Sequence, residues 1–113
     1  MPELPQASQR IIDTPFGQAL GNSFRWQGGQ YCAIHTQHGL VGCGIYDVRI
    51  AGEFGQAVAI ARGTPQKPLC EPEDLFEAKI VEVSRPAEAL GILPGMTGIE
   101  AVHKLLQAGP KAK

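Results

Sequence analysis

The sequence lacks any apolar run of the roughly 20 residues that a membrane-spanning helix requires. It also lacks an excess of one charge, because ten Lys and Arg residues stand against eleven Asp and Glu residues. No stripe of basic residues marks a protein that binds the phosphate backbone of nucleic acids. The composition therefore predicts a protein that binds neither membranes nor nucleic acid.

Cysteine is scarce, and the spacing of Cys32, Cys43 and Cys70 matches no zinc-binding pattern. His35 and His38 lie three positions apart, so on a strand they would face opposite sides. We therefore expect no metal site, and no motif indicates a cofactor. The chain opens with a polar stretch rather than a signal segment, so we expect a soluble cytoplasmic protein with reduced thiols.

The length of 113 residues predicts one domain, and 43% apolar with 19% charged residues is ordinary for a globular chain. A chain of this size hides roughly two-thirds of its unfolded surface, which allows a thin core. Glycine and proline supply 23 of the residues and indicate many turns. We expect a tail at 1–9, a single domain at 10–108 and a second tail at 109–113.

A charge-poor hairpin is predicted near the N-terminus, because the segment 14–46 carries one formal charge, Arg25. Within it, Gln27-Gly28-Gly29-Gln30 favours a two-residue turn centred on the two glycines. One face would then pair Trp26 with Tyr31, Phe24 with Ala33, and Asn22 with His35. A small domain rarely covers both faces of such a sheet, so we expect this region to be partly buried against another subunit.

Short strands and helices are predicted along the rest of the chain. The expected strands are 40–41, 57–61 and 79–84, where Val81 and Glu82 alternate between faces. The expected helices are 45–50, one or two turns at 73–77, a short helix capped by Ser84, and a C-terminal helix that opens with the capping box Thr97–Glu100 and ends at Gly109. The fold class is therefore α+β, with a small antiparallel N-terminal sheet, mixed short strands and a C-terminal helix.

Cys43 is the best candidate for a catalytic residue. It lies between two glycines, after an expected strand and before an expected helix, whose positive end would favour the thiolate. His38 and Asp47 are tentative helpers, although a strand of roughly 13 Å would separate His38 from Cys43 within one subunit. The alternatives are structural: a buried apolar thiol, a turn histidine, and an aspartate that stabilises the helix start.

Four further residues are tentative ligand-binding candidates. Arg62 ends a buried strand, where an arginine either grips a carboxylate or phosphate or forms a surface ion pair. Gly44 allows close approach of another group beside Cys43. Gly95 and Thr97 precede the last helix, whose free amides bind an anion unless they form only a turn and a cap.

The order of these motifs resembles a known family. His38-Gly39-x-x-x-Cys43-Gly44-x-x-Asp47 precedes the strand 57–62, and Leu90-Gly91-Ile92-x-x-Gly95-Met96-Thr97-Gly98-x-Glu100-Ala101 follows it. This pattern is similar to the YunC-like proteins, bacterial and archaeal domains of unknown function, over residues 10–107. The resemblance implies a small α+β protein that forms a tetramer through its N-terminal β region, and it implies no activity. Gly52 and Gly55 shorten the helix after Asp47 relative to the family.

Three functions remain open from the sequence. The first is an oligomeric ligand-binding or accessory protein with sites near Cys43 and at subunit interfaces. The second is a thiol-dependent enzyme with Cys43 as nucleophile, and the third is a structural or scaffolding module. The charge-poor sheet and the lack of a full catalytic set favour the first.

Overall fold

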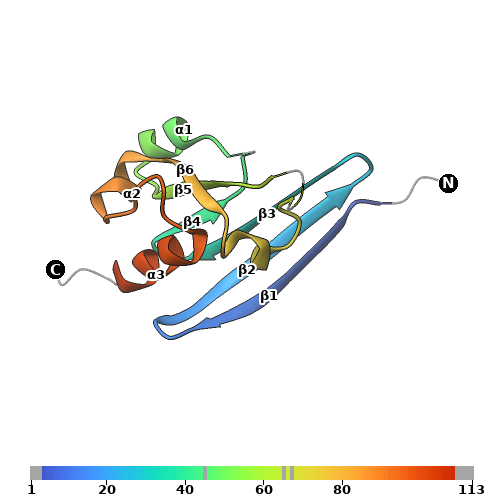
Figure 1. The fold of residues 1–113 in the computed structure, drawn as a ribbon, viewed down its shortest axis with the longest axis horizontal. Coiled ribbons are helices and arrows are strands. Elements are labelled where there is room, and N and C mark those ends of the chain that lie inside the picture. The colour runs from blue at the N-terminus through green and yellow to red at the C-terminus, as the bar shows by residue number, and fades with distance from the viewer. Residues whose placement is uncertain (1–3, 45, 65, 67, 109–113) are drawn as a thin grey trace.

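Six strands form one sheet, and their order across the sheet is their order in the sequence (Figure 1). The computed structural model describes residues 4–44, 46–64, 66 and 68–108. The strands are β1 (Gln6–Thr14), β2 (Gly17–Trp26), β3 (Gly29–Thr36), β4 (Gly39–Gly42), β5 (Val58–Arg62) and β6 (Lys79–Val83). The helices are α1 (Val48–Glu53), the 3-10 helix η1 (Pro72–Leu75), α2 (Arg85–Ala89) and α3 (Gly98–Ala108). This arrangement confirms the α+β class and the C-terminal helix.

The strand pairing changes direction once, between β4 and β5. These two strands run parallel, and α1 provides the crossover between them, whereas the other neighbours in the sheet are antiparallel. A parallel pair needs such a crossover because the chain leaves the carboxyl end of the first strand and must return to the opposite end of the pair, where the second strand begins. The crossover places the carboxyl ends of β4 and β5 side by side.

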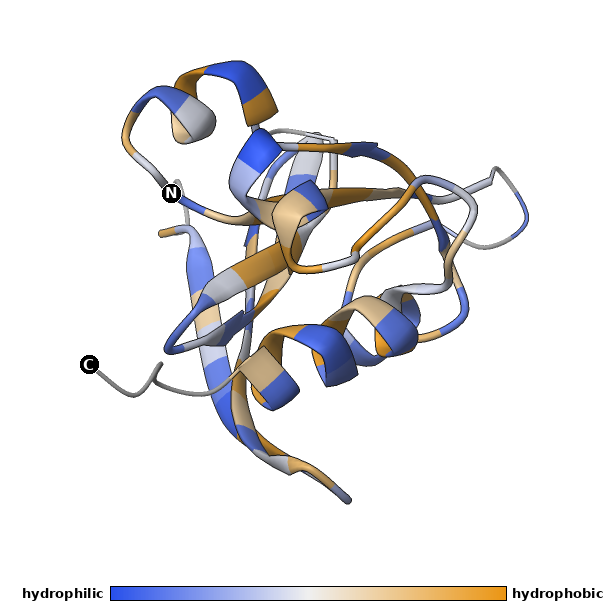
Figure 2. Ribbon diagram, turned by 90° about the vertical axis from the view of Figure 1, so that its left-hand side faces the viewer, coloured by the Kyte–Doolittle hydropathy of each residue, from blue (hydrophilic) through white to orange (hydrophobic). Residues whose placement is uncertain are grey.

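One face of the sheet holds the hydrophobic core. Ile34 and Val41 are fully buried partners on β3 and β4, and Leu105 of α3 is buried in the same core cluster. Helix α3 alternates hydrophobic and hydrophilic residues, as an amphipathic helix does (Figure 2). None of the described helices is long and apolar enough to cross a membrane.

The β1–β2 hairpin runs along the long axis of the molecule and beyond the body of the fold (Figure 1). The turn between β1 and β2 contacts α3, where the ring centroids of Phe16 and His103 lie 4.8 Å apart. Strand β1 begins at Gln6, so the expectation that residues 1–9 are a tail is wrong for 6–9. Pairing with β2 orders these residues, and the hydroxyls of Ser8 and Ser23 lie 2.9 Å apart across the two strands.

Two arginines of the hairpin bind the acidic segment around η1. Arg10 donates hydrogen bonds of 2.8 Å to Glu73 and 2.9 Å to Glu71, and Arg25 forms an ion pair with Glu71. The hydrogen bond from Arg10 holds the pKa of the Glu73 carboxyl below its ordinary value. The acidic run is therefore partly neutralised by residues more than 40 positions away in the sequence.

The register of the β2–β3 hairpin differs from the prediction. Trp26 pairs with Gly29 and Phe24 with Tyr31, so the turn is Gln27-Gly28, one residue earlier than expected. The indole of Trp26 covers Gly29, where an added Cβ would lie 2.5 Å from the ring. Because the pairing shifts by two residues, the aromatic face is still shared by Phe24, Trp26 and Tyr31 as predicted.

The termini of the helices test the predicted caps. Helix α1 begins at Val48 with Asp47 as its N-cap, so the expected helix over 45–50 is wrong in its start. Ser84 caps α2, and Thr97 exchanges hydrogen bonds with Glu100, so these two predictions are confirmed. The expected roles of Ile45 in that helix and of Gly109 as a stop lie outside the described residues.

Candidate functional site

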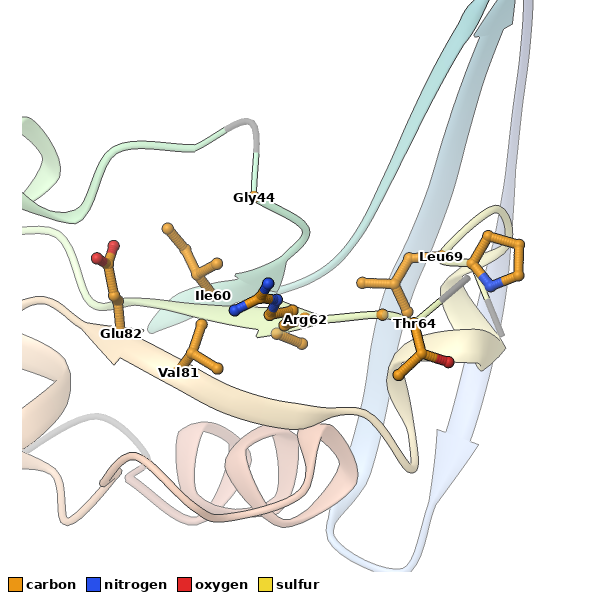
Figure 3. A pocket seen from close by; sticks show the side chains of 10 residues that line it. Gly44, Ile60, Arg62, Thr64, Leu69, Val81 and Glu82 are labelled. Carbon is orange, nitrogen blue, oxygen red and sulfur yellow. The ribbon is translucent and has the colours of Figure 1, made fainter. Parts of the chain in front are cut away.

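An open cavity of about 500 Å3 lies at the carboxyl ends of β4 and β5 (Figure 3). Gly44 follows β4 and Arg62 ends β5, and both line this cavity. Ligands bind preferentially outside the carboxyl ends of parallel strands, where the loops that follow diverge. The fold therefore brings together two of the residues that the sequence singled out for binding.

A β-bulge in β6 shapes the floor of this cavity. Ile60 pairs with Glu82 and Ala61 pairs with Ile80, which leaves Val81 without a partner in the register. Both Val81 and Glu82 line the cavity (Figure 3). The sequence predicted that these two side chains alternate between faces, and the bulge breaks that alternation. Glu82 was therefore missed as a site residue, and no glycine or proline in the strand signals the bulge.

A second open cavity, of about 1,030 Å3, adjoins the first and shares Arg62, Leu69 and Val81 with it. Lys79 also lines it and stands opposite Arg62 in the register of β5 and β6. Like charges directly opposite each other on a sheet repel. Within the described part of the chain, neither side chain forms an ion pair.

Acidic side chains line the far part of the second cavity, and their interactions are internal. Asp74 accepts hydrogen bonds from the backbone amides of Cys70, at 3.1 Å, and Glu71, at 2.9 Å. Glu73 is bound by Arg10, and Glu77 also has an interaction partner. Asp74 therefore stabilises the start of η1, and Glu73 ties η1 to the hairpin; neither forms a described ion pair with Arg62 or Lys79.

Cys43 lies beside Cys32 and does not line either cavity. Its backbone amide donates a hydrogen bond of 3.3 Å to the Cys32 carbonyl, and the residue as a whole is 9% exposed. The expectation that Cys43 sits at a helix N-terminus is wrong, because α1 begins five residues later. Burial raises the pKa of the Cys32 thiol to about 12, with the nearby Cys43 thiol as a smaller contribution.

The two predicted helpers of Cys43 are elsewhere. His38 lies in the turn before β4, where its amide donates to the Thr36 hydroxyl at 3.1 Å, so β4 separates it from Cys43. The Asp47 carboxylate accepts from the amides of Arg49, at 2.8 Å, and Ile50, at 3.3 Å. The structure therefore does not bring the three tentative catalytic residues together within one chain.

Gly95 and Thr97 form a turn and a cap. The amide of Met96 donates to the Leu93 carbonyl at 3.3 Å, which closes a turn around Gly95. Thr97 binds Glu100, and these bonds lower the pKa of the Glu100 carboxyl. The 79–97 bridge places this segment on the opposite side of β6 from Arg62, and neither residue lines the two cavities.

Within the described residues, no group of three His, Cys, Asp or Glu side chains is arranged to hold a metal ion. At the strand ends the two cavities carry two cations, Arg62 and Lys79, an apolar wall, and the carboxylates of Glu82 and of the acids in and just after η1.

The fold and the cavities define a small α+β domain with an open site at the carboxyl ends of a parallel strand pair. The chain belongs to the family described as a domain of unknown function (DUF1805), which matches residues 42–105. This segment contains Gly44, Arg62, Lys79 and Glu82, and β1, β2 and β3 precede it.

One solved structure shares the fold of nearly the whole chain. It is the crystal structure of a protein of unknown function, TA1206, from Thermoplasma acidophilum. The TM-score is 0.78 and the identity 21%, and the match covers 91% of this chain and 96% of the other. No curated protein matches the sequence.

Proposed function

We propose that this protein binds a small molecule that carries an anionic group, a carboxylate or a phosphate, at the carboxyl ends of β4 and β5. The observation that carries the proposal is the cross-strand pair of Arg62 and Lys79, two cations that line one cavity without an ion pair to a described residue. A bound anion would relieve their mutual repulsion. The Arg62 guanidinium offers a planar fork that matches a carboxylate or a phosphate.

The walls of the site suit the rest of such a ligand. Leu69 and Val81 supply apolar surface to both cavities, and Gly44 leaves the rim of the smaller one free of a side chain. Cavities of 300–1,000 Å3 with an apolar wall and a few polar groups are typical of small-molecule sites. The volumes of the two adjoining cavities, about 500 and 1,030 Å3, fall in or close to that range.

Titration with pentanoate and with inorganic phosphate, followed by amide chemical shifts, tests this site. We expect shifts at Gly44 and Gly63, and a loss of affinity of tenfold or more in Arg62→Gln, because the ligand loses a charge-assisted hydrogen bond. Arg49→Gln is the matched control, since the Arg49 side chain is 88% exposed on α1 and lines neither cavity. Equal affinity of wild type and Arg62→Gln for both probes would refute the proposal.

The protein is also proposed to self-associate through the uncovered face of β1, β2 and β3, with a second copy as the partner. Leu20 is 40% exposed and Trp26 44% exposed on this face, and β1 is an edge strand. Asn22 buries its side-chain oxygen there without a hydrogen bond in the described structure. Exposed apolar side chains beside an unpaired strand edge favour association, and the resemblance to the YunC-like proteins implies a tetramer.

Light scattering coupled to size-exclusion chromatography tests the self-association. We expect Leu20→Asp to lower the mass of the wild-type assembly, because a buried unpaired charge opposes association. Leu93→Asp is the control, since Leu93 is at least as exposed, at 48%, but lies in the turn before α3. A monomeric wild type at 100 µM, or an assembly indifferent to Leu20→Asp, would contradict this part of the proposal.

The other two functions have less support. A thiol-dependent enzyme would need an accessible Cys43 near a base, whereas Cys43 is buried and β4 lies between it and His38. A purely structural module would not need the open cavities, or two cations that form no ion pair with a described residue. The three free thiols support a cytoplasmic location, where thiols stay reduced.

A further inference from the structure

Glu82 places a carboxylate in the same cavity as Arg62. Glu82 pairs with Ile60 across β5 and β6, and Arg62 lies two residues further along β5. Diagonal neighbours of this kind are about 7–8 Å apart on the sheet. Both side chains line the smaller cavity, both are exposed, and they form no ion pair with each other.

Apolar side chains separate the two charges. Ile60 and Val81 lie between Arg62 and Glu82 on the cavity floor (Figure 3). The bulge is the reason, because without it Val81 would face away from Glu82. The site therefore presents a cation at one end, an anion at the other and an aliphatic strip between them.

We infer that the ligand is a zwitterion, in which an anionic group and an ammonium group are joined by a short aliphatic spacer. This inference rests on the proposed function and adds the second charge to it. The anionic group would bind Arg62, the ammonium would bind Glu82, and the spacer would cover Ile60 and Val81. Glu82 would then be a specificity residue, since its charge repels ligands that carry only negative groups.

Three probes of similar shape test the inference: pentanoate, pentylamine and 5-aminopentanoate, titrated at pH 7 and followed by amide chemical shifts. We expect 5-aminopentanoate to bind at least tenfold more tightly than either singly charged probe. Glu82→Gln should remove that advantage and leave pentanoate binding intact or stronger. Arg62→Gln should weaken both carboxylates, and Glu88→Gln, an exposed change on α2 outside both cavities, should change nothing.

The outcomes separate the two proposals. If pentanoate binds through Arg62 but 5-aminopentanoate binds no more tightly, the zwitterion inference is overturned and the anion site stands. The same holds if Glu82→Gln leaves the preference for 5-aminopentanoate unchanged. If neither carboxylate binds, the zwitterion inference is overturned, and the anion site is overturned with it when inorganic phosphate does not bind either. The amide spectrum of each variant shows whether its fold is intact, and we expect all three folds to be intact because the substituted side chains are exposed.

Discussion

The backbone amide of Cys43 donates a hydrogen bond to the carbonyl of Cys32, so the two thiols lie on adjacent chain segments just beyond the β3–β4 pairing. Cys32 is fully buried and Cys43 nearly so. Cys70, which precedes η1, is the partly exposed member of the three. Their environments therefore order their reactivity.

We predict that Cys70 is alkylated first, that Cys43 follows slowly, and that Cys32 is modified only when the protein unfolds. A thiol reacts through its thiolate and needs access to the reagent, and Cys32 has neither. Iodoacetamide labelling between pH 6 and 9, resolved by peptide mass spectrometry, measures the three rates. Labelling of Cys43 that is faster than that of Cys70 below pH 7 would instead support the thiol-dependent enzyme.

Alkaline pH should destabilise the protein through Cys32. The folded pKa is about 12 and the value without the fold is 9.0, so the stabilising term is complete below pH 9 and is lost as pH rises toward 12. The loss is about 1.4 kcal/mol per pH unit for one proton. Urea unfolding at pH 7, 9 and 10.5 should show this slope in wild type.

Cys32→Ala provides the comparison for that pH series. It removes the thiol and leaves a small cavity, whose destabilising effect is the same at every pH. We expect its slope between pH 9 and 10 to be shallower than that of wild type. The pKa of Tyr46 is also raised to about 12 by burial, so a residual slope should start above pH 10. Identical slopes in the two proteins would contradict the assignment to Cys32.

Gly98→Ala should destabilise the protein by about 3 kcal/mol, at the upper end of overpacking effects. An added Cβ would lie 1.8 Å from the Leu75 carbonyl oxygen, so the start of α3 would have to move off η1. Gly52→Ala is the control, because the nearest atoms outside its own helix lie 3.8 Å from its added Cβ, an ordinary contact, and alanine favours a helix by up to about 1 kcal/mol. Urea midpoints that rank the two variants in the reverse order would show that α3 is not anchored in this way.

Two helix N-caps should differ in their contribution to stability. The Ser84 hydroxyl accepts from the amide of Val58 at 2.9 Å and donates to the Gln56 carbonyl at 2.8 Å, in addition to its cap bond, and it is buried. Ser84→Ala leaves these groups unpaired and should lower the free energy of unfolding by about 3 kcal/mol. Asp47→Ala removes an exposed cap and should lower it by about 1 kcal/mol. Urea unfolding checks both, and a larger loss for Asp47→Ala would show that Asp47 does more than cap α1.

Local patterns account for what could be predicted. The capping box of Thr97 and Glu100, the cap at Ser84 and the faces of the N-terminal hairpin depend on residues within a few positions of one another. The register of that hairpin could not be predicted, because the packing of Trp26 on Gly29 decides between two turns that the local sequence allows almost equally.

The candidate site was predicted only in part for a related reason. Gly44 and Arg62 were each singled out from their local contexts, and the parallel pairing of β4 with β5 brings them together. Lys79 and Glu82 were missed because each is an ordinary charged residue of a short strand. Only the pairing of that strand with β5 and its bulge give them a role.

The sequence by itself determined the torsional preferences of each segment, the caps at Ser84 and Thr97, the two faces of the N-terminal hairpin and its low content of charge. Each of these depends on short-range sterics and hydrogen bonds, which are local. The tertiary structure decided the strand partners, the bulge at Val81 and the contact of Cys43 with Cys32. These depend on the burial free energy of the whole core, which no local pattern contains, and they place Arg62, Lys79 and Glu82 around one site.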